Sequence, residues 1–238
     1  MTITNIWSFL WLFCTQVFAG AIEDLQLASN PNLSVEQRMS AFDRLVTLGA
    51  TDVRVIREYS LGEDKDIRSR WVAIRVLGKV GGAPAREILP ILSVSEQPVI
   101  RAAAVSALGD MGNVEYIDTI IVRLKDEAIL VRAAAAESLG KLKDPKAISS
   151  LEDIFQSPDS RYQGASLWIR RHYIMAMGEI GDPVVYPTLL MALNDDDPTV
   201  VLATVEALEK ISGFSFSDGR TSLEEQEAWR RWLNNKLK

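Results

Sequence analysis

The sequence predicts an all-α fold in which helical hairpins stack on one another to form an α-solenoid, or superhelix. Similar segments recur about every 31 residues, and within each segment the apolar residues follow the spacing of an amphipathic helix. A second helical pattern follows each segment, with proline at its first turn in three of the copies. A single hairpin cannot bury both of its faces, so neighbouring hairpins must share a core.

The first element is an uncharged segment, residues 1–21, which contains no Asp, Glu, Lys, Arg or His. Its apolar run, Ile6 to Phe13, is followed by small residues at Ala19 and Ala21, a pattern typical of a secretory signal peptide and its cleavage site. We therefore expect a periplasmic or secreted protein, cleaved after one of these two alanines.

Other interpretations of this segment stay open. No Lys or Arg precedes the apolar run, and Ile6 to Ile22 spans 17 residues, the lower limit for an uncleaved membrane anchor. A buried N-terminal helix of a cytosolic protein is a further alternative. Lipidation of Cys14 fits less well, because the bulky Phe13 precedes it. Cleavage would remove this one cysteine, which suits an oxidising compartment.

Residues 22–213 form the predicted solenoid. Gly78, Gly109, Gly140 and Gly178 are separated by 31, 31 and 38 residues, and each follows an arginine by eight positions. We expect each glycine to end the first helix of its repeat by adopting the left-handed conformation. The segments that carry these first helices are Ile67 to Val80, Pro98 to Met111, Ile129 to Leu142, Leu167 to Ile180 and Pro198 to Ile211.

Second helices complete the hairpins, and the count from Ile22 is six helix pairs followed by a terminal helix over Ser222 to Leu237. In residues 214–238, aromatic side chains at helical spacing, Trp229 and Trp232, are expected to cover the open end of the core as a C-terminal cap. The predicted second helices are Ala83 to Val94, Val114 to Lys125, Pro145 to Phe155 and Pro183 to Leu193.

The run VRAAAAESLGKLKDPKAISSL, residues 131–151, resembles the HEAT-like repeats of phycobilisome bilin lyases. The resemblance extends from about Val35 to Ile211, and GFSFSD followed by EAWRRWL resembles the C-terminal caps of bacterial HEAT-repeat proteins. It implies an α-solenoid whose VRxxAxxxLG helices line the concave side. With the leader, it implies an exported bacterial HEAT-repeat protein.

Charge and composition exclude several functions. Lys and Arg total 26 against 32 Asp and Glu, a net charge of −6, so nucleic acid is not expected as a partner. The one histidine, His172, stands where the other repeats carry Val or Ala, which favours packing over catalysis. Asp195, Asp196 and Asp197 lack the alternating spacing of a calcium loop and favour helix capping. We predict no catalytic, cofactor or metal site and no enzyme activity.

The arginines that define the repeat are expected to serve stacking, with stems that pack and guanidinium groups that bridge neighbouring repeats. We expect a monomer, because the C-terminal end is capped, and membrane contact only through an uncleaved leader. The arginines of this column are Arg70, Arg101, Arg132 and Arg170.

A stripe of mixed charges with Trp, Arg and Met on the first helices is the candidate partner surface. The insertion in the 38-residue interval, Ser157 to Ser166, adds a loop at the edge of the solenoid. A solvated face and a tolerated surface loop are the alternatives. The predicted partner-binding residues are Trp71, Arg75, Glu137, Arg171 and Met175, with Arg161 and Tyr162 from the insertion.

These features predict an exported, non-catalytic scaffold that binds a protein or peptide along its concave face. A second hypothesis rests on the family resemblance alone. It is a bilin-lyase-like chaperone or enzyme that acts on a client protein.

Overall fold

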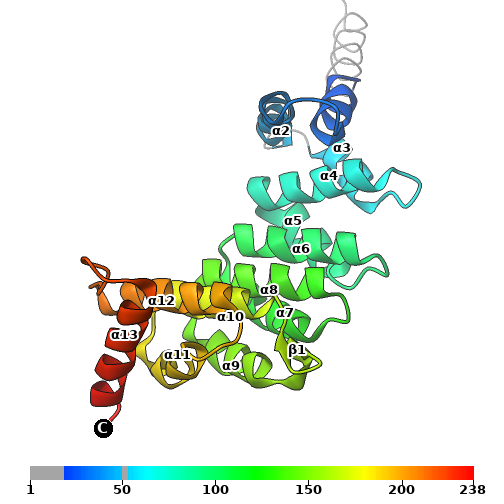
Figure 1. Cartoon of the computed structure of the whole chain (residues 1–238). Coiled ribbons are helices and arrows are strands. Elements are labelled where there is room, and N and C mark those ends of the chain that lie inside the picture. The colour runs from blue at the N-terminus through cyan, green and yellow to red at the C-terminus, as the bar shows by residue number, and fades with distance from the viewer. Residues whose placement is uncertain (1–18, 50–52) are drawn as a thin grey trace, which may run out of the picture. The chain divides into compact units, whose positions relative to one another are not determined.

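The computed structural model describes residues 19–49 and 53–238 (Figure 1). The chain divides into two compact units, residues 1–107 (unit 1) and 108–238 (unit 2). Most of the expected leader, residues 1–18, lies outside the described residues, whereas Ala19 and Ala21 belong to a helical segment over residues 19–29. No helix in the described ranges combines the length and the apolar composition needed to cross a bilayer.

Unit 1 consists of helices joined by short turns. After the helical segment over residues 19–29 come α2 (Val35–Gly49), α3 (Arg54–Leu61), α4 (Ile67–Val80), α5 (Gly82–Leu92) and most of α6 (Pro98–Asp110).

Unit 2 continues the pattern from the end of α6. Its elements are α7 (Ile117–Ile121), α8 (Ile129–Leu142), α9 (Ile148–Gln156), β1 (Arg161–Tyr162), β2 (Ala165–Ser166), α10 (Arg170–Ile180), α11 (Tyr186–Ala192), α12 (Pro198–Ser212) and α13 (Ser222–Lys236). Short 3-10 turns precede α7, α9 and α11 and complete the second helices expected there.

Helix starts follow from local side-chain chemistry. The carboxylates of Asp66 and Asp197 accept hydrogen bonds from backbone N–H groups in the first turns of α4 and α12. Asn113, Asp144 and Asp182 cap the 3-10 turns before α7, α9 and α11 in the same way. Side-chain oxygens at these positions satisfy N–H groups that have no partner inside the helix. The regular recurrence of Asp or Asn therefore marks where successive helices begin.

The repeat glycines lie inside their helices, so the expectation that they end them is wrong. Left-handed residues stand beyond the glycines, at Gly81 after α4, Lys143 after α8 and Gly181 after α10. Gly78 and Gly109 instead face the next first helix with no room for a side chain. A Cβ on Gly78 would lie 2.7 Å from Ala107 Cβ, and a Cβ on Gly109 would lie 2.5 Å from Ser138 Cβ.

Each of these glycines faces a small residue on the next first helix. That residue stands two positions before the glycine position of its own repeat. A Cβ on Gly140 would lie 3.2 Å from Ala176 Cα, and a Cβ on Gly178 would lie 2.7 Å from Ala207 Cβ. Within each unit, the first helices therefore approach backbone to backbone. In unit 2, α10 lies between α8 and α12 and packs against both (Figure 1).

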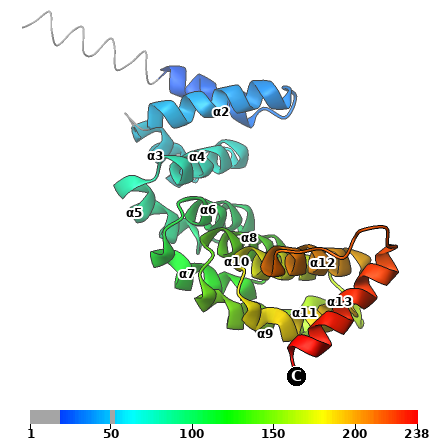
Figure 2. The ribbon, with the colours of Figure 1, turned by 90° about the vertical axis from the view of Figure 1, so that its left-hand side faces the viewer.

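Aromatic residues pack where α13 meets the last repeat. Trp229 is fully buried, stacks on Phe214 with ring centres 5.2 Å apart and meets Phe216 edge to face at 4.7 Å. Trp232 reaches back to Tyr186 at 5.3 Å. Figure 2 shows α13 running past α11 and α12, and α13 packs against both. The predicted all-α solenoid architecture of stacked hairpins is confirmed within each unit.

The glycine contacts predict a graded response to alanine. Gly109→Ala should lower the free energy of unfolding by about 1–3 kcal/mol, because the added methyl group overlaps the Ser138 Cβ and backbone. Gly140→Ala is the matched control, since its Cβ meets its nearest atom at 3.2 Å and alanine also favours the helix. Denaturant unfolding measures both variants. Equal losses would contradict the close approach at Gly109.

Candidate functional site

The predicted partner-binding residues on helices divide between the two units. Trp71 and Arg75 lie on α4 in unit 1, where the Trp71 side chain is 43% exposed. Glu137 on α8 and Arg171 and Met175 on α10 all belong to unit 2 and are exposed. The structure therefore brings the second set together on one stack of helices.

Exposed apolar side chains gather on the first helices of unit 2. Met175 on α10 and Leu130 on α8 are each 49% exposed, and Leu202 on α12 is 60% exposed. Trp168, just before α10, is 43% exposed. Trp168 and Leu130 were not predicted, although both stand two positions before the arginine of their repeat and so occupy equivalent places. We call the exposed side of α8, α10 and α12 the first-helix face.

Charged residues occupy the C-terminal halves of the first helices in unit 2. Lys141 Nζ lies 2.8 Å from Glu137 and 3.0 Å from Asp110. Burial acts to lower the pKa of Lys141, but its hydrogen bonds to these two carboxylates outweigh burial and raise the pKa. On the neighbouring helices, Lys210 Nζ lies 2.5 Å from Glu179. We call this set the charged band; its members are Asp110, Glu137, Lys141, Glu179, Glu206 and Lys210.

A hollow of about 200 Å³ lies between α8 and α10. A smaller one of about 80 Å³ lies between α10 and α12, and Met175 and Glu179 line both hollows. Two predicted residues, Glu137 and Met175, therefore line one site. The residues around the larger hollow, called here the α8–α10 hollow, are Glu137, Gly140, Lys141, His172, Met175, Ala176 and Glu179.

His172 contributes a packed aromatic ring to this hollow. Its ring meets Trp168 edge to face with centres 5.0 Å apart. Burial lowers the pKa of His172 and the nearby Arg171 charge lowers it further, against smaller opposing effects from the Trp168 backbone and Glu137. Its Nδ1 is buried and makes no hydrogen bond within the described residues. The packing interpretation describes this ring, although the hollow that it lines was not anticipated.

The insertion folds into a short hairpin tied to the loop before α12. Arg161 donates to Gly164 O at 2.8 Å and pairs with Asp196 at 3.0 Å. The Ser166 backbone N–H and hydroxyl both contact Asp196, at 3.1 and 2.6 Å, and these bonds hold the pKa of Asp196 well below its usual range. Arg161 therefore holds the hairpin in place, while Tyr162 is exposed beside it.

Capping accounts for only one of the three consecutive aspartates. Asp197 caps α12. Asp195 instead accepts from Arg170 at 2.7 Å, in a pair whose side chains are 6% and 1% exposed. The short spacing before Pro198 suggested a cap, but the insertion and Arg170 supply partners that lie 25 or more residues away in sequence.

The repeat arginines serve structure, as expected. Arg170 also donates to Ser160 Oγ at 2.7 Å, and its guanidinium lies 3.9 Å from the Phe155 ring centre. Arg70 reaches Gln97 in the next repeat. Arg101 and Arg132 each donate to backbone carbonyls of the turn that precedes their own helix. The shorter bond of each arginine, to Ser95 O and to Asp126 O respectively, is 2.9 Å long. These side chains are occupied within the fold.

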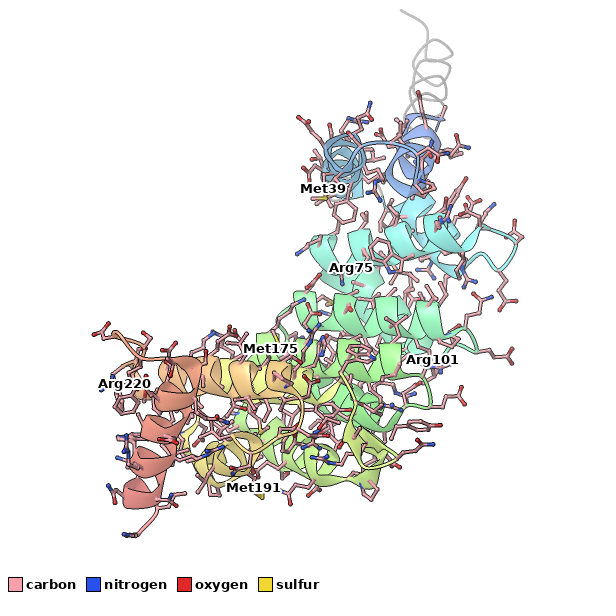
Figure 3. All side chains as sticks on the ribbon, viewed as in Figure 1. Met39, Arg75, Arg101, Met175, Met191 and Arg220 are labelled. Carbon is pink, nitrogen blue, oxygen red and sulfur yellow. The ribbon has the colours of Figure 1, made fainter. Side chains whose placement is uncertain are left out.

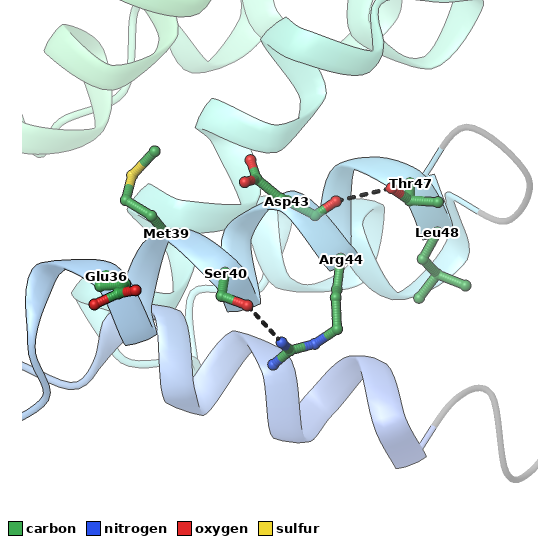
Figure 4. Close-up of a pocket in the computed structure, with 7 residues that line it drawn as sticks. All are labelled: Glu36, Met39, Ser40, Asp43, Arg44, Thr47 and Leu48. Atoms are coloured by element: carbon green, nitrogen blue, oxygen red, sulfur yellow. Dashed lines mark hydrogen bonds between the residues drawn. The ribbon is translucent and has the colours of Figure 1, made fainter.

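Unit 1 carries a separate open pocket along α2, which no sequence pattern predicted (Figure 4). Its volume is about 770 Å³, and its lining residues recur at helical spacing on one side of α2. Arg44, one of the lining residues, donates to Ser40 at 3.0 Å and to Asp24 at 2.5 Å. The lining residues are Glu36, Met39, Ser40, Asp43, Arg44, Thr47 and Leu48.

The family of HEAT repeats matches residues 85–168 and 163–225 of this chain. The chain belongs to the HEAT-repeat family. No curated protein matches it closely in sequence. This HEAT-repeat chain is similar to a solved structure described as the complex of CpcE and CpcF of phycocyanin lyase from Nostoc sp. PCC7120. The identity is 22% with a TM-score of 0.59, over 68% of this chain and 66% of that chain.

Two further solved structures have a similar fold. An engineered protein is 19% identical with a TM-score of 0.52, over 81% of this chain and 89% of that one. The mutant D353K/E396K/D438K of Kap121p is 14% identical with a TM-score of 0.58, over 84% of this chain and 26% of that one. At these identities the likeness supports the fold alone, and the match to the HEAT-repeat family confirms the expected repeat family.

The surroundings of His172 predict an acid-sensitive fold. Because the folded state disfavours the imidazolium, the unfolded chain binds more protons between the folded pKa and 6.5, and stability should rise with pH through that window. The chain has one histidine, so its proton NMR resonance should titrate below pH 6.5. Arg171→Gln should raise the midpoint by removing a repelling charge. A wild-type midpoint at or above 6.5 would contradict the burial.

Proposed function

We propose that this chain is an exported, non-catalytic HEAT-repeat scaffold that binds a protein partner on the first-helix face of unit 2. The observation that carries the proposal is the combination on that face of exposed apolar side chains, two hollows and a charged band. Leu130, Met175 and Leu202 come from adjacent helices, and Trp168 from the turn before α10. Contiguous exposed apolar surface with a polar rim is typical of protein-binding surfaces.

The chemistry of these residues favours a protein partner over a merely solvated face. Trp, Met and Arg are enriched at protein interfaces, and Trp and Arg are frequent among residues whose truncation weakens binding most. Arg171 is exposed, and its side chain makes no ion pair within residues 19–49 and 53–238, so its charge is available to a partner. The surface therefore offers both apolar anchors and a directional charge.

The remaining predicted residues take secondary places in this proposal. Trp71 and Arg75 offer a second contact surface on unit 1. Because the Arg161 guanidinium bonds within the hairpin and to Asp196, Tyr162 is the side chain of the hairpin that can reach a partner. We assign contact to Tyr162 and a positioning role to Arg161.

A photocrosslinking residue in place of Leu202 tests the proposal. It should link the full-length chain to one discrete partner in the producing cells, and the double variant Arg171→Glu with Met175→Glu should reduce the yield about tenfold or more. The matched control is Met191→Glu, because Figure 3 places Met191 on the α11 side of unit 2 and Met175 on the α10 and α12 side. Unchanged melting temperatures show that the variants fold.

Two outcomes of that experiment would argue against the first-helix face as the partner-binding surface. The first is a yield that falls equally in the Met191→Glu control. The second is a set of crosslinks spread over many abundant proteins, as expected for a non-specific apolar surface.

A second candidate function is suggested by the likeness to a chain of phycocyanin lyase. A bilin-lyase-like protein would hold a chromophore while acting on a client protein. The α8–α10 hollow, at about 200 Å³, is smaller than the roughly 300–1,000 Å³ typical of sites that enclose drug-sized ligands. A change in bilin absorbance on addition of the chain would favour this candidate over the scaffold.

Export makes a prediction of its own. N-terminal sequencing of the chain from its producing cells should read Gly20 or Ile22, because small residues precede both positions as signal cleavage requires. The periplasmic or culture fraction should contain this processed form. A start at Met1 in the soluble cytosolic fraction would overturn export and would leave the binding proposal untouched.

A further inference from the structure

We propose that the α8–α10 hollow binds one aromatic side chain of the partner protein, from a segment in which a basic residue stands beside the aromatic one. This inference rests on the proposed binding function of the first-helix face and specifies the chemistry of the partner. It follows from the size of the hollow, the atoms that line it and the charges at its rim.

The size of the hollow matches a single ring. An engineered apolar cavity of about 150 Å³ in another protein binds benzene. At about 200 Å³, the α8–α10 hollow exceeds that volume and falls below that of a site for a whole drug-sized ligand. One aromatic side chain, with its first connecting carbon, is therefore the occupant that the space accommodates.

The walls suit an aromatic ring. Gly140 and Ala176 are small and buried, and they lie against each other where α8 and α10 approach closely beside the hollow. Met175 adds a flexible thioether, which adapts to an inserted ring and makes favourable sulfur contacts with aromatic groups. His172 adds a ring that is neutral at pH 7, since its pKa is lowered, and that is already held edge to face by Trp168.

The charges of the lining favour a cation beside that ring. Two carboxylates, Glu137 and Glu179, lie at the hollow with one ammonium group, Lys141. Lys141 is engaged by Asp110 and Glu137 together. Glu179 also pairs with Lys210 at 2.5 Å and lies 3.8 Å from Lys143. The best exposed carboxylate is that of Glu137, with 60% of its side chain accessible.

The charged band as a whole is also negative. Its four carboxylates and two ammonium groups give a net charge of −2, and the ammonium group of Lys143 near Glu179 reduces this to −1. The Glu206 side chain makes no ion pair or hydrogen bond in the described part of the chain. An acidic residue beside the ring would meet these carboxylates, whereas Lys or Arg would be attracted. Arg171 is the opposing charge and lies next to His172 rather than in the band.

Methyl NMR of the full-length chain with labelled methionines tests the assignment. The probes are acetyl-Trp-Lys-amide, acetyl-Trp-Glu-amide and acetyl-Ala-Lys-amide, and Met175→Leu identifies the Met175 resonance by its loss. Acetyl-Trp-Lys-amide should shift that resonance saturably, because an inserted indole ring lies against the methyl group. Met191, which is exposed and lies on the α11 side of unit 2, serves as an internal control (Figure 3).

The expected selectivity has two parts. Acetyl-Ala-Lys-amide should leave Met175 unmoved. Acetyl-Trp-Glu-amide should bind about three- to fivefold more weakly than acetyl-Trp-Lys-amide, the range of a rim ion pair. Glu137→Gln should narrow that difference without abolishing the shift, since the ring would still enter the hollow.

Three results would overturn the assignment: an unmoved Met175 at millimolar probe, an equal shift at Met191, or tighter binding of acetyl-Trp-Glu-amide. The crosslinking experiment at Leu202 separates this outcome from failure of the proposed function. A discrete crosslinked partner without a Met175 shift would leave the scaffold function standing and remove the aromatic anchor. A Met175 shift without any crosslinked partner would support the aromatic site and argue against the scaffold function.

Discussion

Close approach of successive first helices is the constraint on which the rest of this structure depends. At Gly109 a side chain of any size would overlap Ser138, and at Gly178 it would overlap Ala207. A helix that touches its neighbour through backbone atoms can slide or rotate little without losing the contact. The contact thus sets the register between repeats, and equivalent positions on α8, α10 and α12 fall side by side. The first-helix face is a consequence of that alignment.

The last repeat lacks this close approach at its glycine position. Glu209 stands where the other repeats carry glycine. In the part of the chain that the structure describes, the helix after α12 is α13, which belongs to the aromatic cap instead of a further repeat. No first helix has to approach Glu209, so a side chain is allowed there. The glycine is therefore required by the neighbour that follows it and not by the helix that contains it.

Much of this architecture could be predicted from the sequence because period and helical spacing are local properties. The helix ranges, the prolines at first turns and the structural use of the arginine column all follow from them. The role of Gly109 could not be predicted, because a glycine near a helix end gives the same sequence pattern whether it terminates the helix or contacts the next first helix. The pairing of Asp195 with Arg170 and the α8–α10 hollow depend on how distant segments meet, which no local pattern records.

The residues that depart from the repeat pattern carry the information about function. Repeat consensus residues are explained by stacking: glycines by close approach, arginines by turns and ion pairs, and aspartates by caps. His172 replaces the small residue of its column, and Met175 stands where α8 and α12 have glutamate. The inserted hairpin precedes the same helix. Stacking requires none of these three, yet they gather around α10. The repeat that departs most from the pattern is therefore the one in which selective binding is expected.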